Sequence, residues 1–214
     1  EKAFGIQIDS LSDLVAFGVL PVCIGKATGL CEYLTEKTKA YETVMLLGRT
    51  TDTQDTTGTV LEEREVTSDE EAVRQAILSF VGTYDQIPPM YSAKKIDGKK
   101  LYELAREGKE VVRKPVAVTL SDIEILEMNL PRVRFRVTCS KGTYIRTLCA
   151  DIGEKLGCGA CMEQLLRIRS GSFTLETALR LSEIQKLADE DRLEEVLIPL
   201  EDSFKELPLY RIAP

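Results

Sequence analysis

Histidine is absent from all 214 residues of the chain. This absence excludes the Ser-His-Asp and Cys-His mechanisms of nucleophilic catalysis, because both need an imidazole. It also removes the side chain that most often acts as a general base near neutral pH. Any catalysis by this chain must therefore depend on carboxylates, tyrosines, lysines or arginines.

Cysteine is scarce, with six residues in the chain, which is too few for a disulfide-stabilised scaffold. Two of the six form a C-x-x-C motif, Cys158-Gly-Ala-Cys161. A zinc site would need a second pair of ligands, and a redox motif would be expected near a strand–helix unit rather than after a helix. We therefore favour a structural role for this motif. The other four lie within apolar patterns and are interpreted as small hydrophobic residues: Cys23, Cys31, Cys139 and Cys149.

Long apolar runs are also missing. The longest uncharged apolar run, Leu14 to Gly25, has 12 residues and contains Gly18 and Pro21. A membrane-spanning helix needs about 18 or more apolar residues, and the beginning of the chain does not resemble a secretory signal. With 43% hydrophobic and 29% charged residues, the composition is typical of a soluble globular protein. We expect a cytoplasmic protein that does not contact membranes.

The net charge of −7 is unevenly distributed along the chain. Residues 94–114 hold eight basic and four acidic residues, and residues 132–146 hold five basic residues and no acidic one. The acidic excess lies in residues 183–206, with nine acidic and three basic residues. An acidic average can therefore conceal a basic face. The acid-free run favours binding of a polyanion over an ordinary solvated surface.

A strand followed directly by a helix is predicted between Arg132 and Gly157. Polar and apolar residues alternate from Arg132 to Cys139, as in a half-buried strand. Helical spacing follows, with Thr143 as the expected N-cap and Gly157 as the stop. Arg146 then lies in the first helical turn, where the helix dipole disfavours a cation by roughly 0.3–1 kcal/mol. The arginine either turns to solvent or pairs with a carboxylate or phosphate.

The remaining patterns predict a mixture of strands and helices without a strict βαβ rhythm. Such a mixture favours an α+β fold with a largely antiparallel sheet. Strands are predicted at 41–47, 59–66 and 116–127, with part of a strand at 164–173; helices are predicted after a cap at 67–70, near 101–106, and near 182–187 and 190–196; residues 87–93 are expected to be irregular because of two prolines.

Five segments of the chain resemble, in order and in spacing, motifs of the TruB family of tRNA pseudouridine-55 synthases. They are Gly18–Thr28, Lys39–Thr53, Gln86–Gly108, Cys139–Gly153 and Leu165–Phe173. The resemblance extends from about residue 13 to residue 204. It implies the pseudouridine synthase fold, a central, mostly antiparallel sheet flanked by helices with the cleft across its middle. It also implies a catalytic domain at 1–204, with an RNA-binding thumb at about 86–114, and a tail at 205–214 without an additional domain.

The same resemblance implies an isomerisation of one uridine, at position 55 in the T-arm of tRNA. The N1–C1′ bond breaks, the uracil rotates, and a C5–C1′ bond forms without a metal or an organic cofactor. The target base must first be flipped out of the folded RNA, which costs a few kcal/mol and can be partly offset by stacking on an aromatic side chain, at roughly 1–3 kcal/mol per base. The expected partner is the T-arm stem-loop, bound by a monomer.

Site residues follow from the matching motif positions. Asp13, five residues before Gly18, is the expected catalytic carboxylate. Arg146 is its expected charge partner and keeps it ionised, and Tyr144 is a nearby acid/base or packing group. Tyr41 would stack on the target base. The other expected substrate-binding residues are Leu165, lining the uracil pocket, and Lys94, Lys99, Lys100 and Lys141, holding the RNA.

The match fails at the start of the chain. Relatives place a strand and a helix before the catalytic loop, whereas 12 residues precede Asp13 in this sequence, and Leu14 replaces the usual proline. Asp13 is assigned by its spacing to Gly18, a spacing that Asp9 does not have. Two hypotheses remain: a working tRNA uridine isomerase, and a truncated relative that binds structured RNA through residues 94–114 and 132–146 without chemistry. A C-x-x-C redox or metal module is a third, weaker one.

Overall fold

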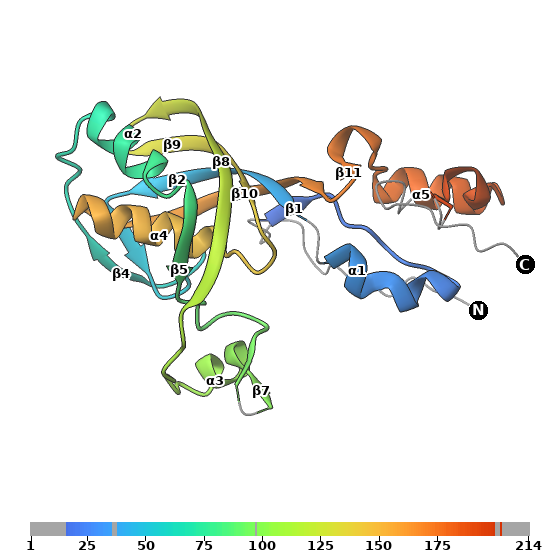
Figure 1. Cartoon of the computed structure of the whole chain (residues 1–214), viewed down its shortest axis with the longest axis horizontal. Coiled ribbons are helices and arrows are strands. Elements are labelled where there is room, and N and C mark those ends of the chain that lie inside the picture. Colours follow the sequence, from blue (N-terminus) through green and yellow to red (C-terminus); the bar gives the residue numbers. More distant parts are fainter. Residues whose placement is uncertain (1–15, 36–37, 97, 200–201, 203–214) are drawn as a thin grey trace, which may run out of the picture.

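The computed structural model describes residues 16–35, 38–96, 98–199 and 202, and within them a twisted sheet forms the centre of the molecule (Figure 1). The strand order is β1-β10-β2-β9-β8-β5, with β11 paired to β10. The pairing of β1 with β10 is parallel and all other pairings in this sheet are antiparallel. The predicted α+β class with a largely antiparallel sheet is confirmed. The strands are β1 Ala16–Gly18, β2 Lys39–Leu47, β5 Gly82–Gln86, β8 Val116–Asn129, β9 Arg132–Cys139, β10 Ala160–Ser170 and β11 Phe173–Thr174.

Two helices, α2 (Glu70–Leu78) and α4 (Ile145–Leu156), pack on one face of the sheet and enclose the core with it. The alternation predicted for β9 is confirmed, because Val133, Phe135 and Val137 are fully buried there. Each such side chain stabilises the fold by about 1.5–3 kcal/mol when removed from water. The core therefore fixes α4 on the sheet, and the first turn of α4 takes its position from that packing.

The two ends of α4 differ in how well the sequence predicts them. Gly157 ends the helix in a left-handed conformation, with φ 75°, as expected. At the start, however, the N-cap is Tyr144 and not Thr143, and no side chain of the cap residue bonds the helix. The Thr143 hydroxyl instead donates to the Ser140 carbonyl at 2.9 Å and closes the preceding turn.

A hairpin next to the sheet carries a loop back to β10. Its strands, β3 (Arg49–Thr51) and β4 (Val60–Glu63), form a separate two-stranded sheet, so the predicted return strand exists but is shorter. Between them, Asp55 forms an isolated bridge with Met162 of β10. Two backbone hydrogen bonds flank the bridge, from Thr56 N to Met162 O at 2.9 Å and from Met162 N to Gln54 O at 3.0 Å. The loop is therefore held against the strand.

The segment expected to be the thumb projects from the sheet between β5 and β8 (Figure 1). Residues 87–94 are irregular, as predicted, and lead into β6 (Lys95–Ile96), β7 (Lys99–Lys100) and α3 (Leu101–Arg106). Leu101 and Leu104 are buried and give this small unit its own apolar centre.

The remaining helices lie beyond the end of β10, away from α2 and α4 (Figure 1). The predicted acidic helices are present there as α5 and a 3-10 helix, with bounds close to those expected. The acidic helices are α5 (Leu181–Asp189) and η3 (Leu193–Val196). The other remaining helices are η1 Gly25–Leu30, α1 Cys31–Thr35 and η2 Leu175–Thr177. In the part of the chain that the structure describes, no helix has the length and apolar character needed to cross a membrane.

Candidate active site

Most of the residues predicted for the site lie on neighbouring elements between the middle of the sheet and one of its ends. Register pairs Lys39 at the start of β2 with Cys139 at the end of β9 and with Ser170 at the end of β10. At the same end, Gln86 closes β5 beside the start of β8, and α4 begins. Tyr41, Tyr144, Arg146 and Leu165 all belong to these elements. The antiparallel topology thus brings together motifs that lie more than 100 residues apart in sequence.

Arg146 is held by three acceptors from two loops. One guanidinium nitrogen, Nη1, donates to Asp55 Oδ2 at 3.0 Å and to the Thr53 carbonyl at 3.3 Å. The other, Nη2, donates to the Tyr91 carbonyl at 2.7 Å. The arginine side chain remains 24% exposed, whereas that of Asp55 is 5% exposed. The expectation that Arg146 needs an anionic partner is therefore met, within the described residues, by Asp55.

The Asp55 carboxylate is enclosed by donors. Its Oδ1 accepts from the Thr53 hydroxyl at 2.8 Å, the Thr57 hydroxyl at 2.5 Å and the Thr57 backbone N–H at 3.1 Å. Burial raises the pKa of Asp55, but the hydrogen bonds from Thr57, Thr53 and Arg146 outweigh it, so the pKa lies below its ordinary value. Asp55 is therefore ionised at neutral pH, and its charge holds the arginine in place.

Asp13, the predicted catalytic carboxylate, lies outside the described residues, so its relation to Arg146 stays a prediction. The segment that follows it is described: β1 pairs in parallel with β10, Ala16 opposite Leu165 and Gly18 opposite Arg167. A Cβ on Gly18 would lie 2.2 Å from the Arg167 carbonyl oxygen, so only glycine permits this close approach. The motif that identified Asp13 is thus docked against β10 at the site.

Tyr41 and Leu165 lie on neighbouring strands. Tyr41 of β2 is opposite Arg167 of β10, and Leu165 is opposite Thr43. Both side chains are partly buried and pack against the core cluster. Burial raises the pKa of Tyr41, although the nearby Arg167 partly offsets the effect, so the phenol is neutral at physiological pH. A neutral aromatic ring that is only partly buried is suited to stacking on a base.

The Tyr144 backbone is held from the side by Gln86. The tyrosine N–H donates to Gln86 Oε1 at 2.8 Å, and Gln86 Nε2 donates to the tyrosine carbonyl at 3.1 Å. Gln86 is 1% exposed, and its Nε2 also donates to the Tyr84 hydroxyl at 2.5 Å. A side chain from β5 therefore accepts from the N–H of the N-cap residue, a bond that the residue at N3 makes in a capping box.

The four predicted RNA-binding lysines fall into two groups. Lys94, Lys99 and Lys100 belong to the thumb, on or next to the β6–β7 hairpin, while the exposed Lys141 lies in the turn between β9 and α4. The Lys100 ammonium group donates to the Tyr102 hydroxyl at 3.1 Å and lies 5.3 Å from the centre of its ring. The structure places these lysines on two separate segments and not in a single cluster.

Acidic residues from neighbouring strands lie next to the run of residues 132–146, which contains no acidic residue in sequence. Arg132 pairs with Glu163 at 2.8 Å, Arg134 with Glu42 at 2.6 Å, and Arg136 with both Glu42 and Glu124. The acids come from neighbouring strands, which the sequence pattern did not reveal. Hydrogen bonds from Arg136 and Arg134 hold the pKa of Glu42 below its ordinary value. The expectation of a basic strand face for a polyanion is therefore wrong for these three arginines.

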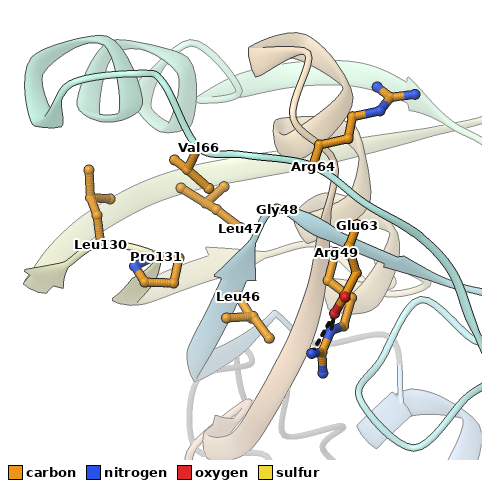
Figure 2. A pocket seen from close by; sticks show the side chains of 9 residues that line it. All are labelled: Leu46, Leu47, Gly48, Arg49, Glu63, Arg64, Val66, Leu130 and Pro131. Atoms are coloured by element: carbon orange, nitrogen blue, oxygen red, sulfur yellow. Dashed lines mark hydrogen bonds and ion pairs between the residues drawn. The ribbon is translucent and has the colours of Figure 1, made fainter.

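A cavity of about 450 Å³ lies at the opposite end of the sheet and contains none of the predicted site residues. Figure 2 shows Arg49 and Glu63 forming an ion pair at its edge, with Leu46 and Pro131 nearby.

Among the described residues, no group of three or more cysteines, aspartates or glutamates is arranged to hold a metal ion. Both cysteines of the C-x-x-C motif are buried and unbonded to each other, consistent with the structural role.

Three contributors to the site were missed by the sequence analysis: Asp55, Gln86 and the Tyr91 carbonyl. Asp55 lies two residues beyond a matched motif, in a polar turn that also contains Thr53 and Thr57. That density of small donors around one carboxylate was a usable signal. Gln86 and Tyr91 lie within the matched segment Gln86–Gly108, but a glutamine near a proline pair and a main-chain carbonyl give no local indication of these contacts.

Comparisons with known proteins agree with this arrangement. A family model described as TruB family pseudouridylate synthase (N terminal domain) matches residues 11–145, and one described as tRNA pseudouridylate synthase B C-terminal domain matches residues 146–205. The chain is 52% identical over 186 residues to tRNA pseudouridine synthase B of Alkaliphilus oremlandii, covering 87% of this chain and 61% of the relative. It is 53% identical over 201 residues to the protein of the same name from Lachnoclostridium phytofermentans, covering 90% and 66%. The chain thus spans about two thirds or less of the length of these relatives.

Solved structures show the same fold. A Cbf5–Nop10–Gar1 complex matches with a TM-score of 0.67 and 30% identity over 90% of this chain and 51% of that one. An H/ACA ribonucleoprotein bound to a substrate RNA containing 2′-deoxyuridine matches with a TM-score of 0.63 and 27% identity, over 90% and 50%. From the matched motifs, the docked β1 segment and these relatives, the chain belongs to the TruB family of pseudouridylate synthases.

Proposed function

We propose that this protein isomerises uridine 55 in the T-arm of tRNA to pseudouridine, with Asp13 as the essential carboxylate. The observation that carries the proposal is the geometry of the sheet and α4: Tyr41 and Leu165 lie on the paired strands β2 and β10, β1 pairs with β10 at Leu165, and Tyr144 and Arg146 lie at the start of α4, which packs on β10. The relatives are named tRNA pseudouridine synthase B, which supports pseudouridine formation in tRNA as the activity of this chain. Within this proposal the protein is a cytoplasmic monomer that uses no cofactor.

The reaction breaks the N1–C1′ bond and joins C5 to C1′, so charge develops at the ribose and on the uracil. A carboxylate at the sugar can act as a nucleophile or a base, provided that it stays ionised and oriented. Arg146 could provide this, because its guanidinium is fixed by Asp55 and two carbonyls and a quarter of its side chain remains accessible. Asp55 then positions the arginine while Asp13 performs the chemistry.

Asp13 precedes Ala16 by three residues, a segment that can span at most roughly 10–11 Å. Since the backbone of Ala16 pairs with Leu165, this tether supports a position for the carboxylate at the same end of the sheet. Tyr41 and Leu165 would hold the flipped uracil there. The proposal therefore assigns a role at the reacting nucleotide to Asp13, Arg146, Tyr41 and Leu165.

The proposal is tested by incubating the protein with a T-arm stem-loop RNA and mapping pseudouridine by carbodiimide adduct formation and primer extension. We expect conversion at the single target uridine and none in a stem-loop that carries cytidine at that position. Retention of the RNA without conversion would instead establish the second hypothesis, an RNA-binding relative without chemistry.

The thumb lysines give a separate prediction for RNA binding. Replacing Lys99 and Lys100 by alanine should weaken binding of the stem-loop, because two cations next to the phosphates are lost. Each phosphate contact contributes roughly 0.7–0.9 to the slope of log K against log salt, so the slope should become shallower by about 1–2. The measurement is a binding titration at several salt concentrations. Lys186→Ala, on the acidic helix α5, is the control and should leave the slope unchanged, and an unchanged slope in the double variant would contradict the thumb assignment.

A further inference from the structure

Gln86 is the best-connected buried side chain at the site that the proposed mechanism does not use. It is the last residue of β5, and the thumb begins directly after it. Its carboxamide makes three hydrogen bonds, two to the backbone of Tyr144 and one to the Tyr84 hydroxyl. We propose that Gln86 is a positioning residue that fixes Tyr144 and the first turn of α4, and through them Arg146, for the isomerisation.

The orientation of the Gln86 amide is determined by its partners. The Tyr144 N–H can only donate and the Tyr144 carbonyl can only accept, so Oε1 must face the first and Nε2 the second. The second Nε2 hydrogen is directed to the Tyr84 hydroxyl. Three of the four hydrogen-bonding positions of the amide are therefore occupied at a site that is 1% exposed. A buried amide satisfied in this way defines one geometry and strongly disfavours others.

The Tyr84 side chain is itself fixed from both sides. Its ring packs edge-on against Phe80 with centroids 5.2 Å apart, and its hydroxyl hydrogen-bonds to Asp151 of α4. Burial raises the pKa of Asp151 to about 6, and the hydrogen bond from Tyr84 partly counters this. The chain of contacts runs from Asp151 through Tyr84 and Gln86 to Tyr144, so it begins and ends on α4. These contacts, which we call the β5–α4 clamp, hold β5 against the first two turns of α4.

The location of this clamp connects it to Arg146. The carbonyl of Tyr144 also accepts the first helical hydrogen bond, from Leu148 N at 3.0 Å, so a shift of Tyr144 moves the start of α4. Arg146 is the second residue of the helix. On the other side, five residues after Gln86, the Tyr91 carbonyl accepts from Arg146 Nη2 at 2.7 Å. Gln86 therefore sets the spacing between the thumb base and the catalytic arginine.

This inference rests on the proposed function for its effect on rate, but its structural part can be measured without catalysis. Gln86→Met keeps the length of the side chain and removes all three hydrogen bonds. We expect the single-turnover rate of pseudouridine formation to fall by about ten- to a hundredfold, since small displacements of catalytic groups have effects of this size. Affinity for the T-arm stem-loop should change by less than about threefold, because Gln86 is buried and touches no RNA in the proposed mode.

Two further variants sharpen the test. Gln86→Glu keeps an acceptor for the Tyr144 N–H but loses the donor to its carbonyl, so its rate should lie between those of the wild type and Gln86→Met. Gln75→Met makes the same chemical change on the exposed face of α2, where Gln75 bonds Glu71 at 2.7 Å, and should leave the rate and the affinity unchanged. A loss of rate and affinity by the same factor in Gln86→Met would overturn the positioning role.

Amide hydrogen exchange of Tyr144, followed by NMR, provides the second readout. The wild type should protect this N–H, Gln86→Glu should retain most of the protection, and Gln86→Met should lose it while the core amides of β9 stay protected. Unchanged protection in Gln86→Met would overturn the inference even if the rate falls. If the wild type forms no pseudouridine, the proposed function fails and the exchange result alone decides whether Gln86 positions Tyr144.

Discussion

Replacing Asp13 by asparagine is expected to abolish pseudouridine formation while the T-arm stem-loop still binds. The asparagine has almost the same shape but cannot attack or deprotonate the ribose, so the step that breaks the glycosidic bond loses its essential group. Removal of a catalytic nucleophile lowers rates by at least about 10³-fold in other enzymes. The measurement is the single-turnover rate on the stem-loop, with RNA affinity determined in parallel.

Asp9→Asn is the matched control for this prediction. The two aspartates lie four residues apart before the same glycine motif, yet only Asp13 has the five-residue spacing to Gly18. We expect Asp9→Asn to retain the wild-type rate. Activity that survives in Asp13→Asn and disappears in Asp9→Asn would show that the spacing to Gly18 selects the wrong carboxylate.

The sequence predicted those parts of the fold whose signal is local. The alternation of β9 and the helical spacing of α4 each lie within a dozen residues, and the structure confirms both. The signal for the end of α4 is equally local, because Gly157 itself adopts the left-handed conformation. The start of α4 was predicted one residue early because its N-cap residue, Tyr144, is held by Gln86, which is 58 residues away. Capping rules consider only neighbours in sequence, and they fail where tertiary structure supplies the partner.

The candidate site shows the same limit more strongly. The unfavourable placement of Arg146 in the first turn of a helix was visible in the sequence, and it correctly indicated a need for an anion. The identity of that anion was not visible, because Asp55 is 91 residues away and reaches the arginine through a loop bridged to β10. For the same reason the ion pairs of Arg134 and Arg136 with Glu42 were missed, since strand pairing places Glu42 opposite Arg136 and within reach of Arg134. Local sequence rules identified Arg146 as a residue that needs an anionic partner, whereas the fold determines that this partner is Asp55.

The Asp55–Arg146 pair is expected to have the second large effect. Asp55→Asn preserves the volume of the side chain but removes the charge, and the guanidinium then lacks its only carboxylate among the described residues. Breaking one side of a buried pair costs about 3–5 kcal/mol; since Arg146 is 24% exposed, we expect about 2–3 kcal/mol of lost stability. The rate should fall by about 10²-fold or more, because the arginine is no longer fixed beside the catalytic carboxylate.

Arg146→Lys tests the other side of the pair. A lysine keeps the positive charge but has no planar fork, so it cannot serve Asp55, the Thr53 carbonyl and the Tyr91 carbonyl together. We expect a loss of rate similar to that of Asp55→Asn with a smaller loss of stability. The stability effects of Asp55→Asn and Arg146→Met should combine to less than their sum in the double variant, as for residues in direct contact.

The pH of the experiment decides whether the pair is fully formed. The folded-state pKa of Asp55 lies below the ordinary aspartate value of 3.8, so the stabilisation is complete above about pH 4 and is lost as the pH falls through the folded-state value. The free energy of unfolding should be measured for the wild type and for Asp55→Asn at pH 7–8 and near pH 3. We expect the wild type to be more stable than Asp55→Asn at pH 7–8, and the difference to be smaller near pH 3.

The ion pair of Arg49 and Glu63 provides the matched control for this cycle. At 2.7 Å it is shorter than the 3.0 Å contact of Asp55 with Arg146, but its side chains are 39% and 61% exposed. It joins the two strands of the β3–β4 hairpin, whereas Asp55 lies in the loop between them (Figure 2). Exposed pairs contribute about 0–1 kcal/mol, so Glu63→Gln should change stability little and the rate not at all. If Asp55→Asn behaves like Glu63→Gln in both measurements, the enclosed carboxylate does not organise the site, and the orientation of Arg146 must come from the two carbonyls alone.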